Sequence, residues 1–122
     1  MFVDGLYSKL DILEKGMQGT VLRNEVIQNN IANADTPNFQ RSDVVFEDYL
    51  ASAIDEAKTT GVLNLDKVVP TVINQGFSYR LDENNVDIET EMVDLYQNSA
   101  RYDMLVSCVN NNYKRINAVF AK

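Results

Sequence analysis

The sequence predicts a mainly α-helical protein in which two long terminal helices pair as a coiled-coil hairpin around a small irregular insert. Two observations indicate this fold class. Each end of the 122-residue chain carries an apolar stripe with alternating three- and four-residue spacing, whereas proline and glycine interrupt the middle. A chain of this length has room for one compact core, and its composition, 45% hydrophobic and 24% charged, is that of an ordered globular protein.

The C-terminal stripe is the more regular of the two. It predicts a helix over residues 88–121, about 50 Å long at about 1.5 Å per residue. Asp87 is the expected N-cap, and Glu89 and Glu91 fall in the first turn, where the positive end of the helix dipole favours carboxylates. Only Ser99 interrupts the stripe with a small polar side chain. The predicted seam on this helix consists of Ile88, Met92, Leu95, Tyr102, Val106, Val109, Tyr113, Ile116 and Phe120.

The N-terminal stripe predicts a second long helix over residues 3–33. Thr20 and Asn24 interrupt its apolar spacing, and polar residues at such positions lower stability but can fix the register of a coiled coil. Gly16 and Gly19 are each expected to weaken the helix by about 1 kcal/mol relative to alanine. The predicted seam on this helix consists of Leu6, Leu10, Leu13, Met17, Ile27 and Ile31.

The first helix should end before Pro37, because a residue that precedes proline is forced away from helical geometry. Asn38, which follows, tolerates a turn conformation. The chain therefore divides into an N-terminal helix at 1–33, an insert at 34–86 and a C-terminal helix at 87–122. The two terminal helices form one structural domain.

Inside the insert, two stretches show regular patterns. Apolar residues at helical spacing predict a short amphipathic helix that Gly61 ends. These apolar residues are Phe46, Leu50, Ile54 and Ala57. Apolar and polar residues alternate over 77–82, which predicts a short strand or an extended arm.

The charge balance excludes several classes of partner. With 18 acidic and 11 basic residues the formal net charge is −7, so the chain lacks the basic surface that nucleic-acid binding requires. It has no apolar run of about 18 residues, and we expect it not to span a membrane. Its first residues lack the basic and apolar regions of a Sec signal, so export would use another route.

The residue types argue against an enzyme. There is no histidine, which excludes histidine-based catalytic and metal sites, and the five glycines do not form a phosphate-binding loop. Carboxylate neighbours such as Asp55 and Glu56 are typical of a solvated helix face. We expect Cys108 and the tyrosines at 96, 102 and 113 to be core residues. No catalytic residue, cofactor, metal or small-molecule substrate is therefore predicted.

Apolar residues outside the two seams predict contacts with other chains. They form a second hydrophobic face on each helix, and a two-helix hairpin has no third layer long enough to cover both faces. The alternative is that the insert folds back and buries this surface in a monomeric bundle. The residues concerned are Phe2, Tyr7, Ile12, Val21, Leu22 and Val26 on the first helix, and Val93, Tyr96, Met104, Leu105 and Val119 on the second.

A motif at the end of the first helix, NNIANADTPNF at residues 29–39, resembles the signature of the flagellar axial proteins of the rod and hook. Asn38 departs from the glycine common in that family, a mild change because asparagine also tolerates a left-handed backbone. We also expect Asn30 and Asn33 to bond backbone groups of the turn or of a neighbour. The motif residues are Asn29, Asn30, Ile31, Asn33, Asp35, Thr36, Pro37 and Phe39.

A second stretch, RLDENNVDIETEM at residues 80–92, is similar to the members of this family that form the proximal rod. The short length of the chain also resembles theirs. The resemblance implies a structural component of the bacterial flagellar basal body, a subunit of a helical hollow tube that transmits torque and continues the export channel.

The resemblance also implies the chain's partners. They would be copies of itself, other rod proteins, the basal adaptor to the MS ring and the type III export apparatus, with no cleaved Sec signal. The alternative from another class is a small cytosolic helical adaptor or export chaperone, which would also be acidic and amphipathic.

Overall fold

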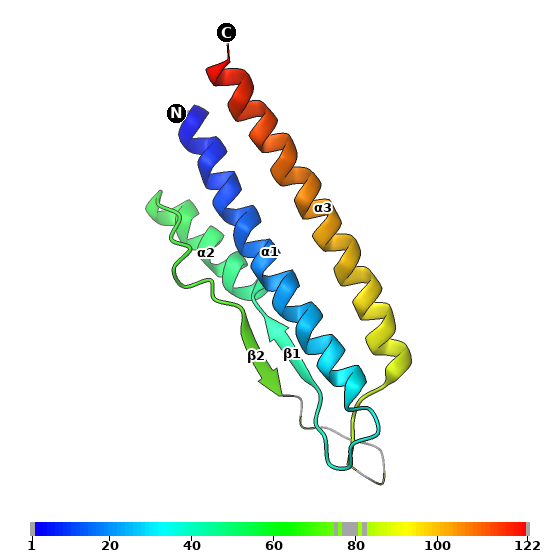
Figure 1. Cartoon of the computed structure of the whole chain (residues 1–122). Coiled ribbons are helices and arrows are strands. Elements are labelled where there is room, and N and C mark those ends of the chain that lie inside the picture. Colours follow the sequence, from blue (N-terminus) through cyan, green and yellow to red (C-terminus); the bar gives the residue numbers. More distant parts are fainter. Residues whose placement is uncertain (1, 75, 77–80, 82, 122) are drawn as a thin grey trace.

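Two long helices pair along one side of the molecule, and the insert lies on the other. The computed structural model describes residues 2–74, 76, 81 and 83–121, with only the backbone for residues 2–6. The elements are α1 (Phe2–Ala32), β1 (Ser42–Val45), α2 (Glu47–Thr60), β2 (Thr71–Asn74) and α3 (Ile88–Phe120). In Figure 1, α1 and α3 lie side by side with both chain ends at the same end of the pair. The predicted mainly α fold, with long terminal helices and a small insert, is confirmed.

The start of α3 agrees with the prediction in its capping residue. The side chain of Asp87 accepts hydrogen bonds from the backbone N–H groups of Glu89, at 3.1 Å, and Thr90, at 3.4 Å. These bonds satisfy two of the amides that have no partner within the first turn of a helix. Asp87 is therefore the N-cap of α3, as the sequence indicates.

The end of α1 also follows the sequence. The helix ends at Ala32, and the chain turns through the Pro37 region. Asn38 adopts a left-handed backbone with φ of 63°. This geometry explains why asparagine is acceptable at a position where a glycine would also fit.

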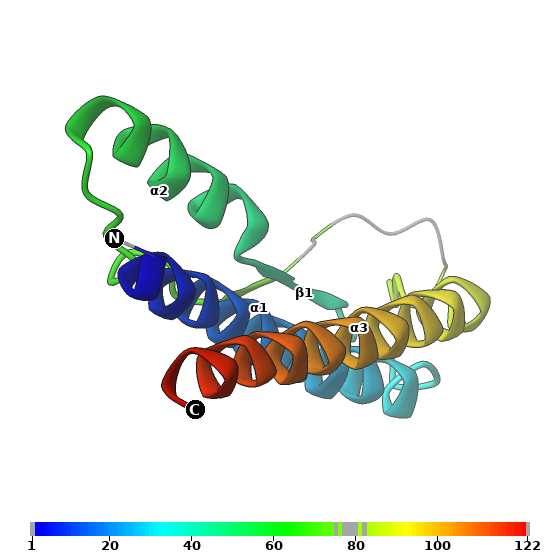
Figure 2. The same cartoon turned by 90° about the horizontal axis from the view of Figure 1, so that it is seen from above.

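The insert contains the short helix that the apolar spacing predicts, and a sheet that it does not. Gly61, with φ of 78°, ends α2 in the left-handed conformation, as expected. β1 and β2 form an antiparallel pair in which Ser42 lies opposite Asn74 and Val45 opposite Thr71. The extended segment predicted over 77–82 falls outside the described residues except for Leu81, which lies in a turn. Figure 2, from above, shows α2 standing on one side of the helix pair.

The main apolar core lies between α1 and the insert. Val26 of α1, Val44 of β1 and Phe46 at the start of α2 are buried together, and Leu22 packs against them. The insert therefore covers one face of α1, while α3 packs against another (Figure 1).

Among the described residues, no helix combines the length and the continuous apolarity that crossing a bilayer requires.

Two glycines of α1 occupy different packing environments, and this difference predicts opposite effects of the same substitution. A Cβ on Gly19 would stand 2.5 Å from Cδ1 and 2.6 Å from Cζ of the buried Phe46 ring, whereas a Cβ on Gly16 would meet only Leu105 methyl groups at 3.4–3.5 Å. We expect Gly19→Ala to lower the free energy of unfolding by about 1–2 kcal/mol, because the clash exceeds the gain in helix propensity.

Gly16→Ala is the matched control and should raise the same free energy by about 0.5–1 kcal/mol. Urea denaturation followed by circular dichroism measures both changes. Equal effects at the two positions would contradict the close approach of α1 to Phe46.

Candidate assembly site

The helix pair meets along a seam that is partly polar. On α3 the residues turned toward α1 follow alternating four- and three-residue spacing, as in a coiled coil. Several of them carry polar side chains, and the buried carboxylate of Glu91 is only 1% exposed. The buried or half-buried members of this row are Glu91, Leu95, Asn98, Leu105, Val109, Asn112 and Ile116.

The predicted seam on α3 shares three of these seven positions with the observed one, namely Leu95, Val109 and Ile116. At the other four positions the observed residue directly precedes the one that the apolar spacing selects: Glu91 precedes Met92, Asn98 precedes Ser99, Leu105 precedes Val106 and Asn112 precedes Tyr113. Leu95, Val106 and Val109 are half-buried and Ile116 is buried. The remaining predicted seam residues are exposed in the single chain, namely Ile88, Met92, Tyr102, Tyr113 and Phe120.

The predicted seam on α1 lies closer to the observed packing. Ile27 is 3% exposed and buried, while its neighbours along the row are half-buried. These half-buried residues are Leu10, Leu13, Met17 and Ile31. The side chain of Leu6 lies outside the described part of the chain.

The two polar interruptions of the α1 stripe, Thr20 and Asn24, meet Asn98 of α3 in the middle of the pair. Asn98 of α3 donates through Nδ2 to the backbone oxygen of Thr20 at 2.7 Å and, more weakly, to Oδ1 of Asn24 at 3.4 Å. Both Asn98 and Thr20 are buried. Because a one-residue shift of α3 would break these bonds at a buried position, the contact favours one register of the two helices.

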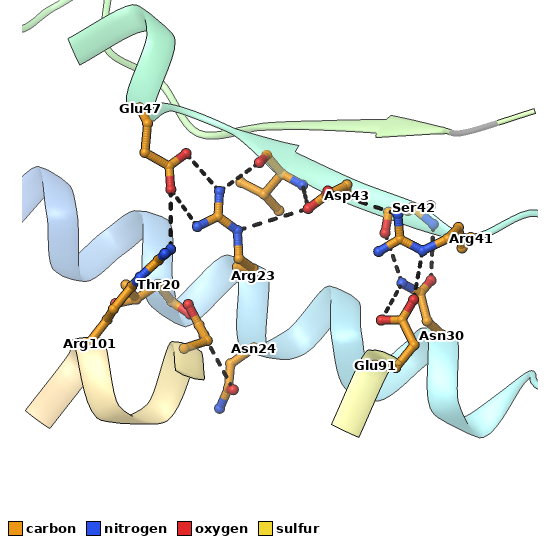
Figure 3. Close-up of polar contacts among 12 residues, drawn as sticks. Thr20, Arg23, Asn24, Asn30, Arg41, Ser42, Asp43, Glu47, Glu91 and Arg101 are labelled. Carbon is orange, nitrogen blue, oxygen red and sulfur yellow. Dashed lines mark hydrogen bonds and ion pairs between the residues drawn. The ribbon is translucent and has the colours of Figure 1, made fainter. Parts of the chain in front are cut away.

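A buried ion pair joins α3 to the segment that leads into β1. Arg41 donates through Nε to Oε1 of Glu91 at 2.6 Å, and Nδ2 of Asn30 donates to Oε2 at 3.3 Å (Figure 3). Asn30 also binds both backbone groups of Ser42, donating to its oxygen at 2.8 Å and accepting from its amide at 3.0 Å. Asn30 therefore holds the end of α1 against both β1 and α3.

Hydrogen bonds within the chain hold the motif turn. Asn33 donates to the backbone oxygen of Asn29 at 2.9 Å and to its Oδ1 at 2.6 Å, and Thr36 donates through Oγ1 to Asn33 at 3.1 Å. Asn30 and Asn33 both bond backbone groups, as expected, but Asn30 bonds Ser42 of β1 rather than the turn, and Asn33 bonds Asn29 just before the turn. Of the other motif residues, Ile31 and Phe39 are half-buried, whereas Asp35 and Pro37 are exposed.

Asn84 ties the motif turn to the start of α3. Its Nδ2 donates to three backbone oxygens, those of Asn33 at 2.9 Å, Ala34 at 3.0 Å and Thr36 at 2.8 Å. Its Oδ1 accepts from the backbone amide of Val86 at 2.8 Å, and the residue is completely buried. The sequence offered only its place within residues 80–92 as a signal for this role.

A second ion pair, which no pattern in the sequence indicates, joins α2 to α1. Arg23 donates to Glu47 through both terminal nitrogens, at 2.5 and 2.7 Å (Figure 3). Its guanidinium lies 5.2 Å from the centre of the Phe46 ring. The hydrogen bond to Glu47 raises the pKa of Arg23 against the opposing effect of burial. Burial alone raises the pKa of Glu47, but hydrogen bonds from Arg23 and the backbone, with the Arg23 charge, bring it below its ordinary value.

The comparisons with known proteins agree with the motif. A family model described as flagella basal body rod protein matches residues 10–40, which include the motif turn. The chain is 32% identical to the flagellar basal body rod protein FlgB of Bacillus subtilis, over 88% of each protein. The FlgB of Borrelia hermsii is 34% identical over 98% of this chain and 95% of that protein. The chain belongs to the FlgB family.

Membership in the FlgB family defines the function at the level of the organelle. The chain is a structural component of the flagellar basal body rod, and its location is the flagellar basal body. FlgB of Borreliella burgdorferi is similar at 35% identity over 96% of this chain and 93% of that protein. These relatives match nearly the whole chain, so the likeness includes the insert as well as the two terminal helices.

In this member of the FlgB family, a large part of the apolar surface of α3 faces outward. Tyr96 is 70% exposed, Met104 65% and Phe120 66%. The expectation that the tyrosines at 96, 102 and 113 and Cys108 are core residues is wrong, because all four are exposed. Tyr102 and Cys108 lie at the edges of the contact between α1 and α3, where each borders a hollow lined by residues of both helices.

The described residues give no indication of metal chemistry. Within the part of the chain that the structure describes, no three Cys, Asp or Glu side chains gather as a metal site requires. The two arginine pairs join elements of the fold to one another. The arrangement therefore holds two stiff helices in a fixed register and displays apolar side chains to the outside.

Proposed function

We propose that the chain is a proximal rod subunit that assembles into a helical hollow tube, transmits torque and continues the export channel. The observation that carries this proposal is the exposed apolar surface of α3, above all Tyr96, Met104 and Phe120. Water-exposed apolar side chains of this size along one rod-shaped helix favour contact with other subunits. Repeated from copy to copy, a contact that does not close into a ring builds an open helical assembly.

The internal contacts support the mechanical part of the proposal. A subunit that transmits torque must keep its helices in register under load. The bonds from Asn98 to Thr20 and from Asn30 to Glu91 oppose sliding of α3 along α1. In the proposed tube the terminal helices at 1–33 and 87–122 form the inner layer, and the motif residues fix the turn at its end.

The proposed partners are copies of the chain, other flagellar rod proteins, the basal adaptor to the MS ring and the export apparatus. Export would proceed through the flagellar type III apparatus without a cleaved Sec signal. We propose no enzymatic activity. Assembly with other subunits accounts for the exposed apolar surface of α3, and the internal ion pairs serve the stability of the fold.

The experiment is complementation of a deletion strain of the source bacterium with the tagged chain, followed by isolation of basal bodies. The expected result is restored motility and the chain in the rod fraction. Asn33→Ala and Pro37→Ala should still be secreted but should form few or no rods, while Asn110→Ala, on an exposed part of α3, is the matched control. A chain that stays in the cytosol as a stable dimer, absent from basal bodies, would instead indicate an adaptor or export chaperone.

A further inference from the structure

The two-stranded sheet of the insert has one edge that side chains of α1 hold and one edge that is open. On the held edge, Asn30 bonds both backbone groups of Ser42, and Arg23 donates to the backbone oxygen of Val44 at 2.8 Å. The sheet consists of β1 and β2, and β2 lies on the side of β1 that is away from α1 (Figure 1). Among the described residues, no strand therefore borders the outer edge of β2.

The bonds on the held edge determine which residues of β1 bond β2. Along an antiparallel pair, the backbone groups of successive residues point alternately toward the partner strand and away from it. The backbone amide of Ser42 donates to Asn30, and that of Val44 donates to the side chain of Asp43. Because neither amide bonds β2, the residues of β1 that face β2 are Asp43 and Val45.

The same alternation identifies the backbone groups that β2 presents to the outside. The two bonded residues of β1 lie opposite Ile73 and Thr71, so the N–H and C=O groups of these two residues face β1. The backbone groups of Val72 and Asn74 then point to the open edge. All four residues of β2 are exposed, with Val72 at 47% and Ile73 at 40%. An incoming strand can therefore bond Val72 and Asn74 without displacing β1.

The composition of β2 lacks the residues that usually prevent one strand edge from pairing with another. Charged side chains, above all lysine, and proline within an edge strand oppose such pairing. No charged residue occurs between Lys67 and Arg80, and Pro70 precedes the strand rather than interrupting it. Three of the four residues are β-branched, a type that strands favour. Only the shortness of β2 limits the pairing, so the contact should be weak.

We infer that β2 pairs antiparallel with β2 of a second copy of this chain, which creates a four-stranded sheet about a two-fold axis. In such a pair, outward-pointing residues must lie opposite outward-pointing residues. Val72 opposite Asn74 of the other copy meets this condition twice, and each of the two pairs exchanges two backbone hydrogen bonds. The two Ile73 residues then face each other on the axis. Centring the pair on Val72 instead would place Asn74 opposite Pro70, which has no N–H to donate.

A second copy fits this edge better than a partner of different sequence. The edge carries no charge with which to select a foreign strand, and two copies meet there without like-charge repulsion. Pairing also adds two strands to a sheet that two strands alone stabilise poorly. A two-fold contact closes on itself and cannot repeat along a helical tube. The contact therefore belongs to the chain outside the rod, and it does not depend on the proposed function.

Disulfide trapping tests the register of this contact. A chain with Cys108→Ser and Ile73→Cys has one thiol, which would lie opposite its own copy in a non-hydrogen-bonded pair. The Cα atoms of such a pair are about 4.5 Å apart, within the range of a disulfide. Mild oxidation of the purified chain should therefore give a covalent dimer. The matched control combines Cys108→Ser with Ser52→Cys, an exposed thiol on α2, and should stay mostly monomeric.

Sedimentation velocity measures the contact without a disulfide. From about 10 μM to about 1 mM, a range suited to a weak contact, the unsubstituted chain should show a monomer–dimer equilibrium. Val72→Pro removes an N–H that points away from β1, so it should weaken the dimer about tenfold or more and leave the helical circular dichroism signal unchanged. A chain that stays monomeric throughout, with no more disulfide at position 73 than at 52, would overturn the inference. A dimer that Val72→Pro leaves unchanged would overturn it too.

Discussion

Replacing Glu91 with alanine is expected to lower the free energy of unfolding by about 3–5 kcal/mol. Glu91 is 1% exposed, and its carboxylate receives both Nε of Arg41 at 2.6 Å and Nδ2 of Asn30 at 3.3 Å. Removal of the carboxylate leaves the Arg41 charge largely buried with its nearest counterion gone. A loss of this size is a large part of the total stability of a small domain, about 5–15 kcal/mol.

The measurement is urea denaturation of the purified chain, followed by the helical circular dichroism signal. Glu91→Gln keeps the shape and one acceptor oxygen but removes the negative charge, so its loss should be smaller than that of alanine. Glu89→Ala, two residues earlier and exposed, is the matched control and should change the free energy by about 1 kcal/mol or less. Equal losses of unfolding free energy from Glu89→Ala and Glu91→Ala would show that the buried Arg41–Glu91 pair contributes no more to stability than an exposed carboxylate does.

The parts of the fold that the sequence predicts are those set by neighbouring residues. Asp87 caps α3 because its side chain reaches amides two and three residues ahead, and Gly61 ends α2 because it accepts a left-handed backbone. The turn after α1 depends in the same way on Pro37 and on Asn38. Such signals act within a few residues, so they are visible in the sequence alone.

The β1–β2 pair was not predicted because its partners lie far apart in the chain. Ser42 pairs with Asn74, and each strand has only four residues, too few for an alternating pattern to be distinguished from an irregular segment. All four residues of β2 are exposed, so its apolar residues do not alternate between a buried and an open face. Pairing of this kind depends on long-range contacts that propensity does not encode.

The observed seam of α3 differs from the predicted one for a related reason. Apolar spacing alone places Met92 and Ser99 in the contact with α1, and it places Glu91 and Asn98 on the solvent side of the helix. Burial of Glu91 and Asn98 depends on partners 50 and 78 residues away, Arg41 and Thr20. A polar residue can occupy a seam when its hydrogen bonds are made there, and only the folded chain reveals those bonds.

This difference also explains the apolar surface that remains outside. Because polar side chains fill part of the inner row of α3, apolar residues of the predicted seam, such as Met92 and Tyr113, lie on its outer flank. The hairpin is therefore held in register by polar contacts, and a substantial part of its hydrophobic surface stays available to other subunits. The sequence predicted the excess of apolar surface but not which side of the helix would display it.

Replacing Asn84 with alanine is the second large expected effect, a loss of about 2–4 kcal/mol in the free energy of unfolding. Asn84 is fully buried, and its one amide group supplies hydrogen bonds to the backbone oxygens of Asn33, Ala34 and Thr36. Alanine removes the donor, so three carbonyl groups of the motif turn lose a partner, and the one that belongs to the buried Ala34 is hardest for water to reach. The same loss should loosen the motif turn from the start of α3.

The decisive comparison is Asn84→Asp, measured by urea denaturation at pH 7 beside Asn84→Ala and the exposed control Asn110→Ala. Aspartate has nearly the volume of asparagine, so a role in packing alone predicts that it is tolerated. A role as hydrogen-bond donor predicts the reverse, because a carboxylate would face three carbonyl oxygens and repel them. We therefore expect Asn84→Asp to be at least as destabilising as Asn84→Ala, and Asn110→Ala to stay within about 0.5 kcal/mol of the unsubstituted chain.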